Sequence, residues 1–197
     1  LSRNINTDKN FGFIKEIRKF DDKIPIGLLV YSNLVYQRGI NNFYKDAKKA
    51  GVDSVLIADL PIEEASEYIL AGRKNNVDTV FIVSPLTSDK RLAKIAQKVR
   101  GFVYVVARLG VTGARADVKT DTLQLLKRIR PQTSLPLCAG FGISKPDHVK
   151  SVLKAGADGA IVGSAVVKII EKNLNNKKNM MYEISKFVAE MKRATTD

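Results

Sequence analysis

The sequence has few of the residues and segments that mark secreted, metal-binding or membrane proteins. Its single cysteine, Cys138, excludes an intrachain disulfide, and apolar neighbours suggest a small buried side chain rather than a reactive thiol. Its single histidine, His148, has no acidic or thiol cluster beside it, so we assign no metal site and expect a solvated ring. No apolar run reaches the roughly 18 residues of a membrane span, and the start is too polar for a secretory signal. These absences predict a cytoplasmic protein with no membrane contact.

Acidic residues are also scarce relative to basic ones. The 20 Asp and Glu face 33 Lys and Arg, which gives a formal net charge of +13. Such an excess fits either a nucleic-acid surface or an attraction for anionic ligands. The basic residues are spread over nearly every expected helix rather than gathered in one stripe, so we predict no nucleic-acid binding. The 197 residues, 45% of them apolar, suit one well-buried core in a single domain.

Short apolar runs that suit buried parallel strands alternate with helical segments along the chain. The strands are expected at Ile24–Tyr31, Ser54–Ala58, Thr79–Val83, Phe102–Ala107, Leu135–Ala139 and Gly159–Val162. Segments of helical periodicity between them lie at Ile40–Ala50, Ile62–Asn75, Arg91–Val99, Thr122–Arg130 and Asp147–Ala155. Glycines 51, 101 and 156 sit where helices end before the next strand. The pattern predicts an α/β protein built of repeating βα units.

This repeat fits either an open doubly wound sheet or a (β/α)8 TIM barrel. Only six strands are expected, whereas a barrel of this kind needs eight to close. The chain opens on a helix, Thr7–Phe20, with Thr7 as a plausible N-cap, which suggests that a strand should precede it. We therefore interpret residues 1–197 as a single barrel domain, truncated at the N-terminus, in which about six βα units are present and the N-terminal two are missing.

Glycine turns follow the last two expected strands. The first is Gly140-Phe141-Gly142-Ile143-Ser144, and the second is Gly163-Ser164, which leads into the helical run Ala165–Glu171. Backbone N–H groups that lack a nearby Cβ can close on phosphate oxygens, and a helix N-terminus adds its positive dipole end. Barrel enzymes often bind phosphate after strands seven and eight, where these turns fall if two strands are missing. The alternative is that each is an ordinary tight turn.

Two further segments at strand ends are candidates for function. The loop Arg108–Asp117 carries two glycines around Thr112, which suits either a lid that orders over a ligand or a surface loop of no special role. Asp59 follows the expected strand Ser54–Ala58, where barrel enzymes place catalytic residues. It is a candidate acid or base, or a cap for the turn before Pro61.

Five segments together resemble one known family. They are Pro25-Ile26-Gly27-Leu28-Leu29-Val30-Tyr31-Ser32-Asn33, Gly51-Val52-Asp53 with Ala58-Asp59-Leu60-Pro61, Gly110-Val111-Thr112-Gly113, Gly140-Phe141-Gly142-Ile143-Ser144 and Gly163-Ser164-Ala165. In this order and spacing they resemble the tryptophan synthase alpha chains, and the similarity extends to the tail at Phe187–Lys192. Five motifs in register are far more specific than any one of them.

The resemblance implies a lyase of tryptophan biosynthesis that cleaves indole-3-glycerol phosphate to indole and glyceraldehyde 3-phosphate. It implies an alpha2beta2-type complex in which indole passes to a beta subunit that holds pyridoxal phosphate, and no cofactor in this chain. By matching motif, the phosphate would be held by Gly113, Phe141, Gly142, Gly163 and Ser164. Tyr31 and Tyr104 would line the indole pocket, with Thr112 on the lid. The beta subunit would contact Asn33, Asp59 and Pro61.

One departure from the family bears on activity. The family's catalytic glutamate and aspartate lie in a stretch that reads roughly E-L-G-I-P-F-S-D-P, and nothing in this sequence matches it. Retro-aldol cleavage needs positioned groups that deliver and remove protons. We therefore expect no catalytic residue in this chain, because the family's pair would lie before Leu1, and we expect the chain as given to be inactive.

Other interpretations of the same residues stay open. One is a non-catalytic barrel fragment that binds phosphate or docks to the beta subunit, another is a different sugar-phosphate TIM-barrel enzyme, and a third is a basic RNA-associated protein. Other phosphate-binding barrels share paired glycine turns, but they would not be expected to combine the segment Gly110–Gly113 with Tyr31-Ser32-Asn33.

Overall fold

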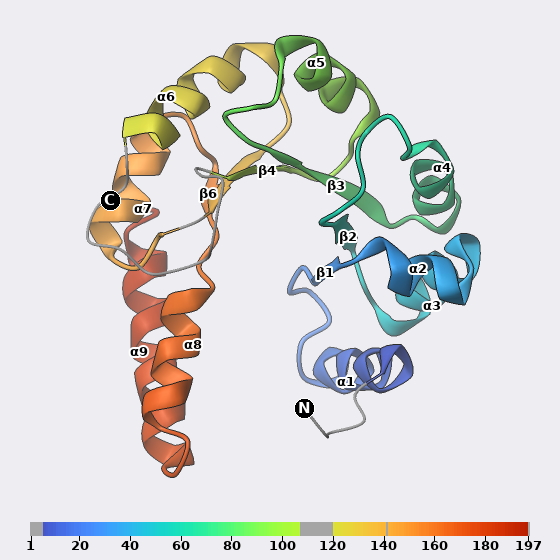
Figure 1. The fold of residues 1–197 in the computed structure, drawn as a ribbon. Helices are drawn as coiled ribbons and strands as arrows, with labels where there is room; N and C mark the ends of the chain where they lie inside the picture. Colours follow the sequence, from blue (N-terminus) through green and yellow to red (C-terminus); the bar gives the residue numbers. More distant parts are fainter. Residues whose placement is uncertain (1–5, 107–119, 141, 197) are drawn as a thin grey trace. The chain divides into compact units, whose positions relative to one another are not determined.

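The computed structural model describes residues 6–106, 120–140 and 142–196, except the side chains at 120 and 121 (Figure 1). The chain divides into two compact units. The first comprises Leu1–Phe81 with Gln97–Gly101, and the second comprises Ile82–Ala96 with Phe102–Asp197.

The first unit is built on parallel strands in chain order. These are β1 (Gly27–Val30), β2 (Ser54–Ile57) and the first part of β3 (Asp78–Val83), with Gly27 opposite Ser54 and Ser54 opposite Asp78. Its helices are α1 (Thr7–Phe20), α2 (Ser32–Arg38), α3 (Ile40–Ala50) and α4 (Ser66–Asn75). The helices between successive strands provide the crossover connections that parallel neighbours need.

The core of this first unit lies between α1, α3 and the strands. Phe11 of α1 packs on Phe43 of α3 with their ring centroids 5.5 Å apart, and Tyr44 beside Phe43 is fully buried. Burial raises the pKa of Tyr44 to about 12, so its phenol is neutral at physiological pH. The apolar face of α3 therefore anchors α1 to the unit.

The second unit repeats the same βα construction. Its strands β4 (Val103–Val106), β5 (Leu137–Gly140) and β6 (Gly159–Ala160) are parallel and in chain order. The helices are α6 (Thr120–Ile129), the 3-10 turn η1 (Arg130–Gln132), α7 (Pro146–Lys154), α8 (Ser164–Lys172) and α9 (Lys177–Arg193), while α5 (Asp89–Lys98) belongs to this unit up to Ala96. Helices α8 and α9 pack side by side (Figure 1).

The expected strands all form, within a few residues of their predicted positions. Helix α1 has the predicted bounds, but its N-cap is Asn6, whose Oδ1 accepts the N–H of Lys9 at 2.9 Å, and not Thr7. The helix expected from Ile62 begins only at Ser66, because the chain first turns after Pro61, where the N–H of Glu64 bonds the Pro61 carbonyl. Helix α2 was not predicted, because it has only seven residues and its N-cap residue, Tyr31, has no capping side chain, so the sequence carries too little local signal.

Three helix-to-strand connections share one backbone conformation. Gly51, Asn76 and Gly156 adopt positive φ angles of 94°, 53° and 102°. The following residue then bonds back to the helix, as when the N–H of Val52 donates to the Ala47 carbonyl at 3.0 Å. The next residue is an aspartate at or just before the strand in all three cases, namely Asp53, Asp78 and Asp158.

In the first unit, Asp53 is held by an arginine clasp. The Nη2 of Arg18, in the last turn of α1, lies 2.6 Å from Asp53 Oδ2. The same oxygen accepts the N–H of Ile26 at 2.8 Å, just before β1, and the Arg18 guanidinium also donates twice to the Gly51 carbonyl. One carboxylate thus joins α1 to the starts of two neighbouring strands.

The second unit contains the same clasp from different residues. Arg130 Nη1, just after α6, lies 2.7 Å from Asp158 Oδ2, and that oxygen accepts the N–H of Leu137 at 2.8 Å. Arg130 also donates to the carbonyl of Leu135 at 2.9 Å. A charged and bidentate donor suits this task, because it serves a carboxylate and backbone carbonyls at once. Both units therefore fix the register of a strand pair in the same way.

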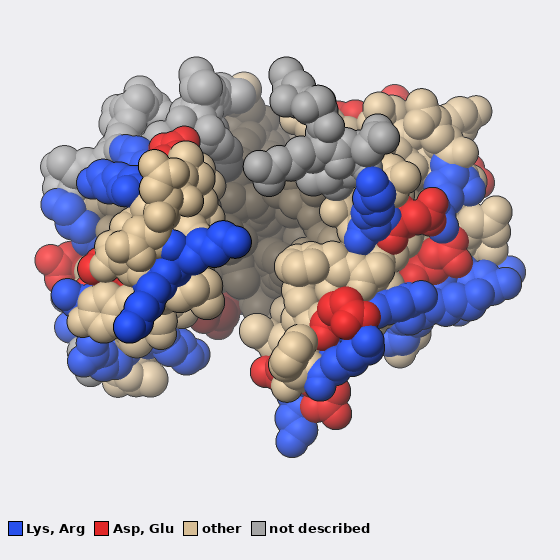
Figure 2. Space-filling model, turned by 90° about the horizontal axis from the view of Figure 1, so that it is seen from below, with Lys and Arg blue, Asp and Glu red and all other residues tan. Residues whose placement is uncertain are grey.

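On the face drawn in Figure 2, positive and negative side chains lie among one another. Several of these charges are paired, for example Arg38, which contacts both Asp8 and Asp46 at 2.8 Å. In the part of the chain that the structure describes, no helix has the length and apolar character needed to cross a membrane.

The Arg130 clasp predicts a measurable loss of stability. Arg130→Met keeps the aliphatic stem but removes the donors to Asp158 and Leu135, so the free energy of unfolding should fall by about 1–2 kcal/mol in urea denaturation. The matched control is Lys19→Met, whose ion pair with Glu16 is exposed on both sides and should contribute less than about 0.5 kcal/mol. Equal effects of the two substitutions would contradict the role of the clasp.

Candidate functional site

The first glycine turn lies in the second unit, between the end of β5 and the start of α7. Gly142 has a φ of 84°, a conformation that L side chains rarely adopt. No described heavy atom comes within 4 Å of the position that a Cβ on Gly142 would occupy. The turn thus requires glycine for its backbone conformation, and the described residues leave the space beside Gly142 open.

The second glycine turn is the N-terminus of α8. Gly163 is the N-cap, and its carbonyl accepts the N–H groups of Val166 and Val167 at 2.9 and 3.2 Å. Gly163 has no side chain that could cap this end, and apart from its chain neighbours no described heavy atom lies within 4 Å of a Cβ built on it. The first N–H groups of a helix have no acceptor within the helix and carry its positive dipole end. This end of α8 therefore has the chemistry that favours an anion.

Tyr104 lies close to the first turn. It belongs to β4, opposite Cys138 of β5, and is 8% exposed. A Cβ on Gly140 would overlap the Tyr104 ring, so glycine at the end of β5 is required by the close approach of this ring. Burial raises the pKa of Tyr104, which keeps its phenol neutral.

Cys138 is half-buried rather than fully buried as expected. Burial and the nearby Asp158 carboxylate both raise the pKa of its thiol. The thiol therefore stays protonated at neutral pH, which agrees with the expectation of an unreactive cysteine.

The expectation of a solvated His148 is wrong. The residue is 5% exposed, and its Nδ1 lies 3.2 Å from the Gly142 carbonyl oxygen and 3.3 Å from the Ser144 backbone nitrogen. His148 is in the first turn of α7, and the glycine turn folds back over that turn of helix. The sequence shows a polar residue at a helix start, but it does not show that the preceding loop covers it.

In the first unit, Asp59 caps a helix. It follows β2, and its carboxylate accepts the N–H of Ser32 at 2.7 Å and the Ser32 hydroxyl at 2.9 Å, at the first residue of α2. Burial opposes ionisation, but these hydrogen bonds and one from its own backbone N–H outweigh it and lower the pKa of Asp59. Asp59 is therefore ionised at neutral pH and is a poor proton donor there. It caps α2 rather than the turn before Pro61.

The other predicted residues fall in two groups. Asn33 and Tyr31 flank Ser32 and are exposed, and Pro61 lies two residues after Asp59. The first unit therefore holds all three residues predicted to face a partner. Thr112, Gly113 and Phe141, together with the loop expected at Arg108–Asp117, lie outside the described residues.

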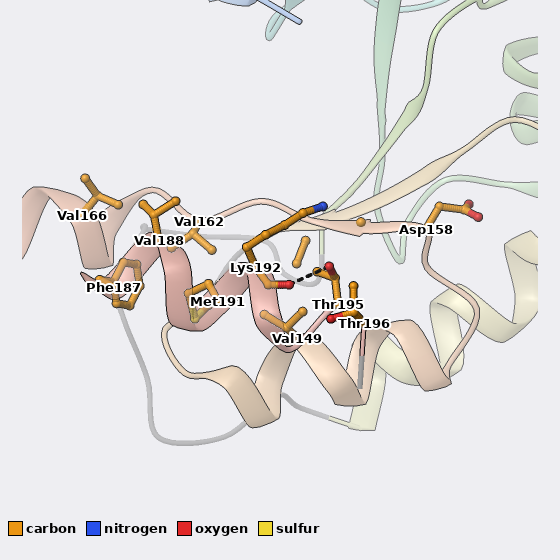
Figure 3. Close-up of a pocket in the computed structure, with 12 residues that line it drawn as sticks. Val149, Asp158, Val162, Val166, Phe187, Val188, Met191, Lys192, Thr195 and Thr196 are labelled. Atoms are coloured by element: carbon orange, nitrogen blue, oxygen red, sulfur yellow. Dashed lines mark hydrogen bonds between the residues drawn. The ribbon is translucent and has the colours of Figure 1, made fainter. Parts of the chain in front are cut away.

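The second unit also contains a cavity. It measures about 590 Å³ and is lined mainly by apolar side chains, including Val162, Val166, Phe187 and Met191 (Figure 3). None of the predicted site residues that the structure describes is among the residues that line it. Among the described residues no group of three His, Cys, Asp or Glu side chains is placed to hold a metal ion.

The parallel βα units and the two glycine turns at strand ends define an α/β protein with the features of a phosphate-binding βα fold. Comparison with known proteins makes this specific. The family profile described as tryptophan synthase alpha chain matches residues 1–196, so the chain belongs to the tryptophan synthase alpha chain family.

Individual relatives agree with this assignment. The alpha chain of Methanothermobacter thermautotrophicus is 45% identical over 194 residues, which cover 98% of this chain and 72% of the relative. That of Vibrio cholerae is 45% identical over 99% of this chain and 73% of its own length. A solved structure of the tryptophan synthase α2β2 complex from Pyrococcus furiosus aligns with a TM-score of 0.87 at 38% identity, over 95% of this chain and 74% of that one. The similarity extends across both units, which supports the barrel interpretation over an open sheet.

In the first unit, a substitution at Asp59 can test whether this residue caps α2. Asp59→Ala removes the acceptor for the Ser32 N–H, so amide hydrogen exchange at Ser32 should become about fivefold faster or more, as expected for a lost cap of about 1 kcal/mol. Asp59→Asn keeps a side-chain oxygen at that position and should exchange closer to the unsubstituted rate. If all three proteins exchanged alike, Asp59 would not be holding α2.

Proposed function

We propose that this chain works as the alpha subunit of tryptophan synthase, and that the phosphate group of its substrate is recognised by the two glycine turns of the second unit. The family activity is cleavage of indole-3-glycerol phosphate to indole and glyceraldehyde 3-phosphate. The observation that carries the proposal is the space that the described residues leave open beside Gly142, at a left-handed turn, and beside Gly163, the N-cap of α8.

In this family the alpha and beta subunits have different roles. The alpha chain needs no cofactor of its own, and pyridoxal phosphate belongs to the beta subunit. Here Gly142, Gly163 and Ser164 are proposed to bind phosphate, together with Gly113 and Phe141, which lie outside the described residues. Backbone N–H groups suit this task, because they stay neutral donors whatever the charge of the phosphate.

The remaining predicted residues have proposed roles within the same reaction. Tyr31 and Tyr104 are proposed to contact the indole ring, and Thr112 is proposed to lie on a closing lid. A neutral Tyr104 with a buried ring offers an apolar face to an aromatic substrate. We further propose that residues 1–197 belong to a single barrel domain that works in the cytoplasm, where a lone free cysteine is stable.

Cleavage requires acid and base groups that we propose this chain does not supply. Asp59, which follows β2, is the candidate carboxylate in the first unit. Its oxygens accept hydrogen bonds from the N–H and the hydroxyl of Ser32, and these bonds lower its pKa. The sequence has no counterpart of the family's E-L-G-I-P-F-S-D-P stretch. The chain would then provide substrate binding and partner contact, while proton transfer depends on carboxylates from outside residues 1–197.

Phosphate recognition at Gly163 predicts a selective loss of affinity. Gly163→Val places a side chain in space that the described residues leave open, and unfolding in urea, measured in parallel, checks that the variant keeps the fold. The affinity for inorganic phosphate, measured by calorimetric titration, should fall about tenfold or more, since the side chain blocks approach to the backbone. The matched control is Gly12→Val, also open in space but in α1, which should leave phosphate affinity unchanged. Equal affinity in all three proteins would contradict the site.

The absence of acid and base groups predicts no turnover by the isolated chain. Indole release from indole-3-glycerol phosphate by the 197-residue chain should be undetectable, with or without a beta subunit. A version extended at its N-terminus by the family's carboxylate-bearing strands should turn over, and replacing the added glutamate with glutamine should lower the rate about 10²–10⁴-fold while the fold is kept. Robust turnover by the unextended chain that is abolished by Asp59→Asn would instead make Asp59 the catalyst.

We propose that the beta subunit docks on the exposed start of α2 and on the segment from Asp59 to Pro61. Charge reversal at Asp59 is a poor test, because it would also release the helix that this residue caps. The sharper change is Asn33→Trp, at an exposed α2 position, which should weaken beta-subunit binding about tenfold or more in a titration. Asn42→Trp, an exposed asparagine on α3, is the matched control and should bind normally. The docking face would be wrong if the two variants bound equally well.

A further inference from the structure

The sole histidine of the chain lies buried against the proposed phosphate turn. His148 is only 5% exposed, although histidine carries two polar nitrogens that ordinarily bond to water or to another partner. The residue belongs to α7, which begins at Pro146 directly after the turn. Val149 and Val152 of the same helix are buried, so α7 is firmly seated and holds the ring in place.

The ring is bonded to the turn through one nitrogen. Nδ1 lies 3.3 Å from the backbone nitrogen of Ser144 and 3.2 Å from the carbonyl oxygen of Gly142. A bare Nδ1 accepts the Ser144 N–H, whereas an Nδ1 that carries hydrogen donates to the Gly142 oxygen, so one of the two contacts is a hydrogen bond at any moment. Either bond ties the ring to the same three-residue segment, whose middle residue, Ile143, is itself buried.

The segment held in this way contains the residue of the turn with a left-handed backbone. Gly142 has its φ at 84°, and no described atom lies within 4 Å of a Cβ placed on it. Packing on that side therefore contributes little to its conformation. The hydrogen bond with the His148 ring and the burial of Ile143 are two contacts that can hold this conformation before a ligand arrives. A preformed turn binds an anion without the cost of ordering the backbone on binding.

We propose that His148 is a positioning residue for phosphate recognition. It acts from beneath the turn, through Nδ1, to hold the backbone from Gly142 to Ser144 in the conformation that receives phosphate, and it does not touch the phosphate itself. The inference rests on the proposed phosphate site and adds to it the side chain that shapes the first turn.

The test uses the full chain and inorganic phosphate as the probe, with two substitutions of similar size. In His148→Asn the side-chain amide places a polar atom close to the position of Nδ1, whereas His148→Leu fills the space without one. Phosphate affinity should fall about tenfold in His148→Leu, as expected for a lost hydrogen bond, and should stay within about threefold in His148→Asn. Unfolding in urea is measured in parallel, because a merely structural role would lower stability in His148→Leu without changing the affinity of the folded protein.

A second measurement needs no substitution. Because the chain has one histidine, its imidazole ¹⁵N signals are unambiguous, and saturation with phosphate should shift the Nδ1 signal. If the unsubstituted chain binds phosphate and Gly163→Val abolishes that binding, but His148→Leu binds as tightly and the Nδ1 signal does not move, the positioning role is overturned while the site stands. Failure of the unsubstituted chain to bind phosphate overturns the site and this role together.

Discussion

The fold of both units depends on a carboxylate placed where one strand begins beside its neighbour. Asp53 accepts hydrogen bonds from the backbone N–H of Ile26, just before β1, and from the guanidinium of Arg18 at the end of α1. Asp158 accepts them from the backbone N–H of Leu137 in β5 and from the guanidinium of Arg130, just after α6. A parallel strand pair has no hairpin to set its register, so a contact of this kind at the strand starts supplies what a turn supplies in antiparallel sheets. The arginine joins its neighbouring helix to the same carboxylate. With the strand starts fixed, the opposite strand ends lie at defined places, and the residues proposed for function follow those ends.

At the strand ends the chain uses side chains of one segment to shape the backbone of another. Asp59 follows β2 and caps α2, and His148 in α7 is bonded to the turn that follows β5. Neither residue need touch a ligand to matter. Both satisfy backbone groups in irregular segments, where an unpaired N–H or carbonyl would cost free energy. The segments proposed to meet phosphate and the beta subunit are thereby held by residues next to them, and not only by their own sequence.

The same arrangement explains why Asp59 is not proposed as the catalyst despite its place at a strand end. A general acid at neutral pH needs a raised pKa, and a general base needs a free lone pair directed at substrate. Its oxygens accept from the Ser32 amide and hydroxyl, and those bonds lower its pKa. The chemistry of this residue suits the fixing of α2, which carries the exposed Asn33 that we propose contacts the beta subunit.

The sequence alone determined the α/β class, the six strands, the bounds of α1, the glycine turns and the family, because each rests on a local signal. Periodicity shows buried faces, glycine marks positive φ, and five motifs in register exceed what any single turn can indicate. Only the tertiary structure decided that His148 is buried, that Asp59 caps α2, that α2 forms at all, and that Arg18 and Arg130 meet Asp53 and Asp158. Those contacts join residues up to 35 positions apart, as Arg18 and Asp53 are, or place a loop over a helix start. A single sequence carries no signal for such pairs, since what brings them together is the packing of the elements between them.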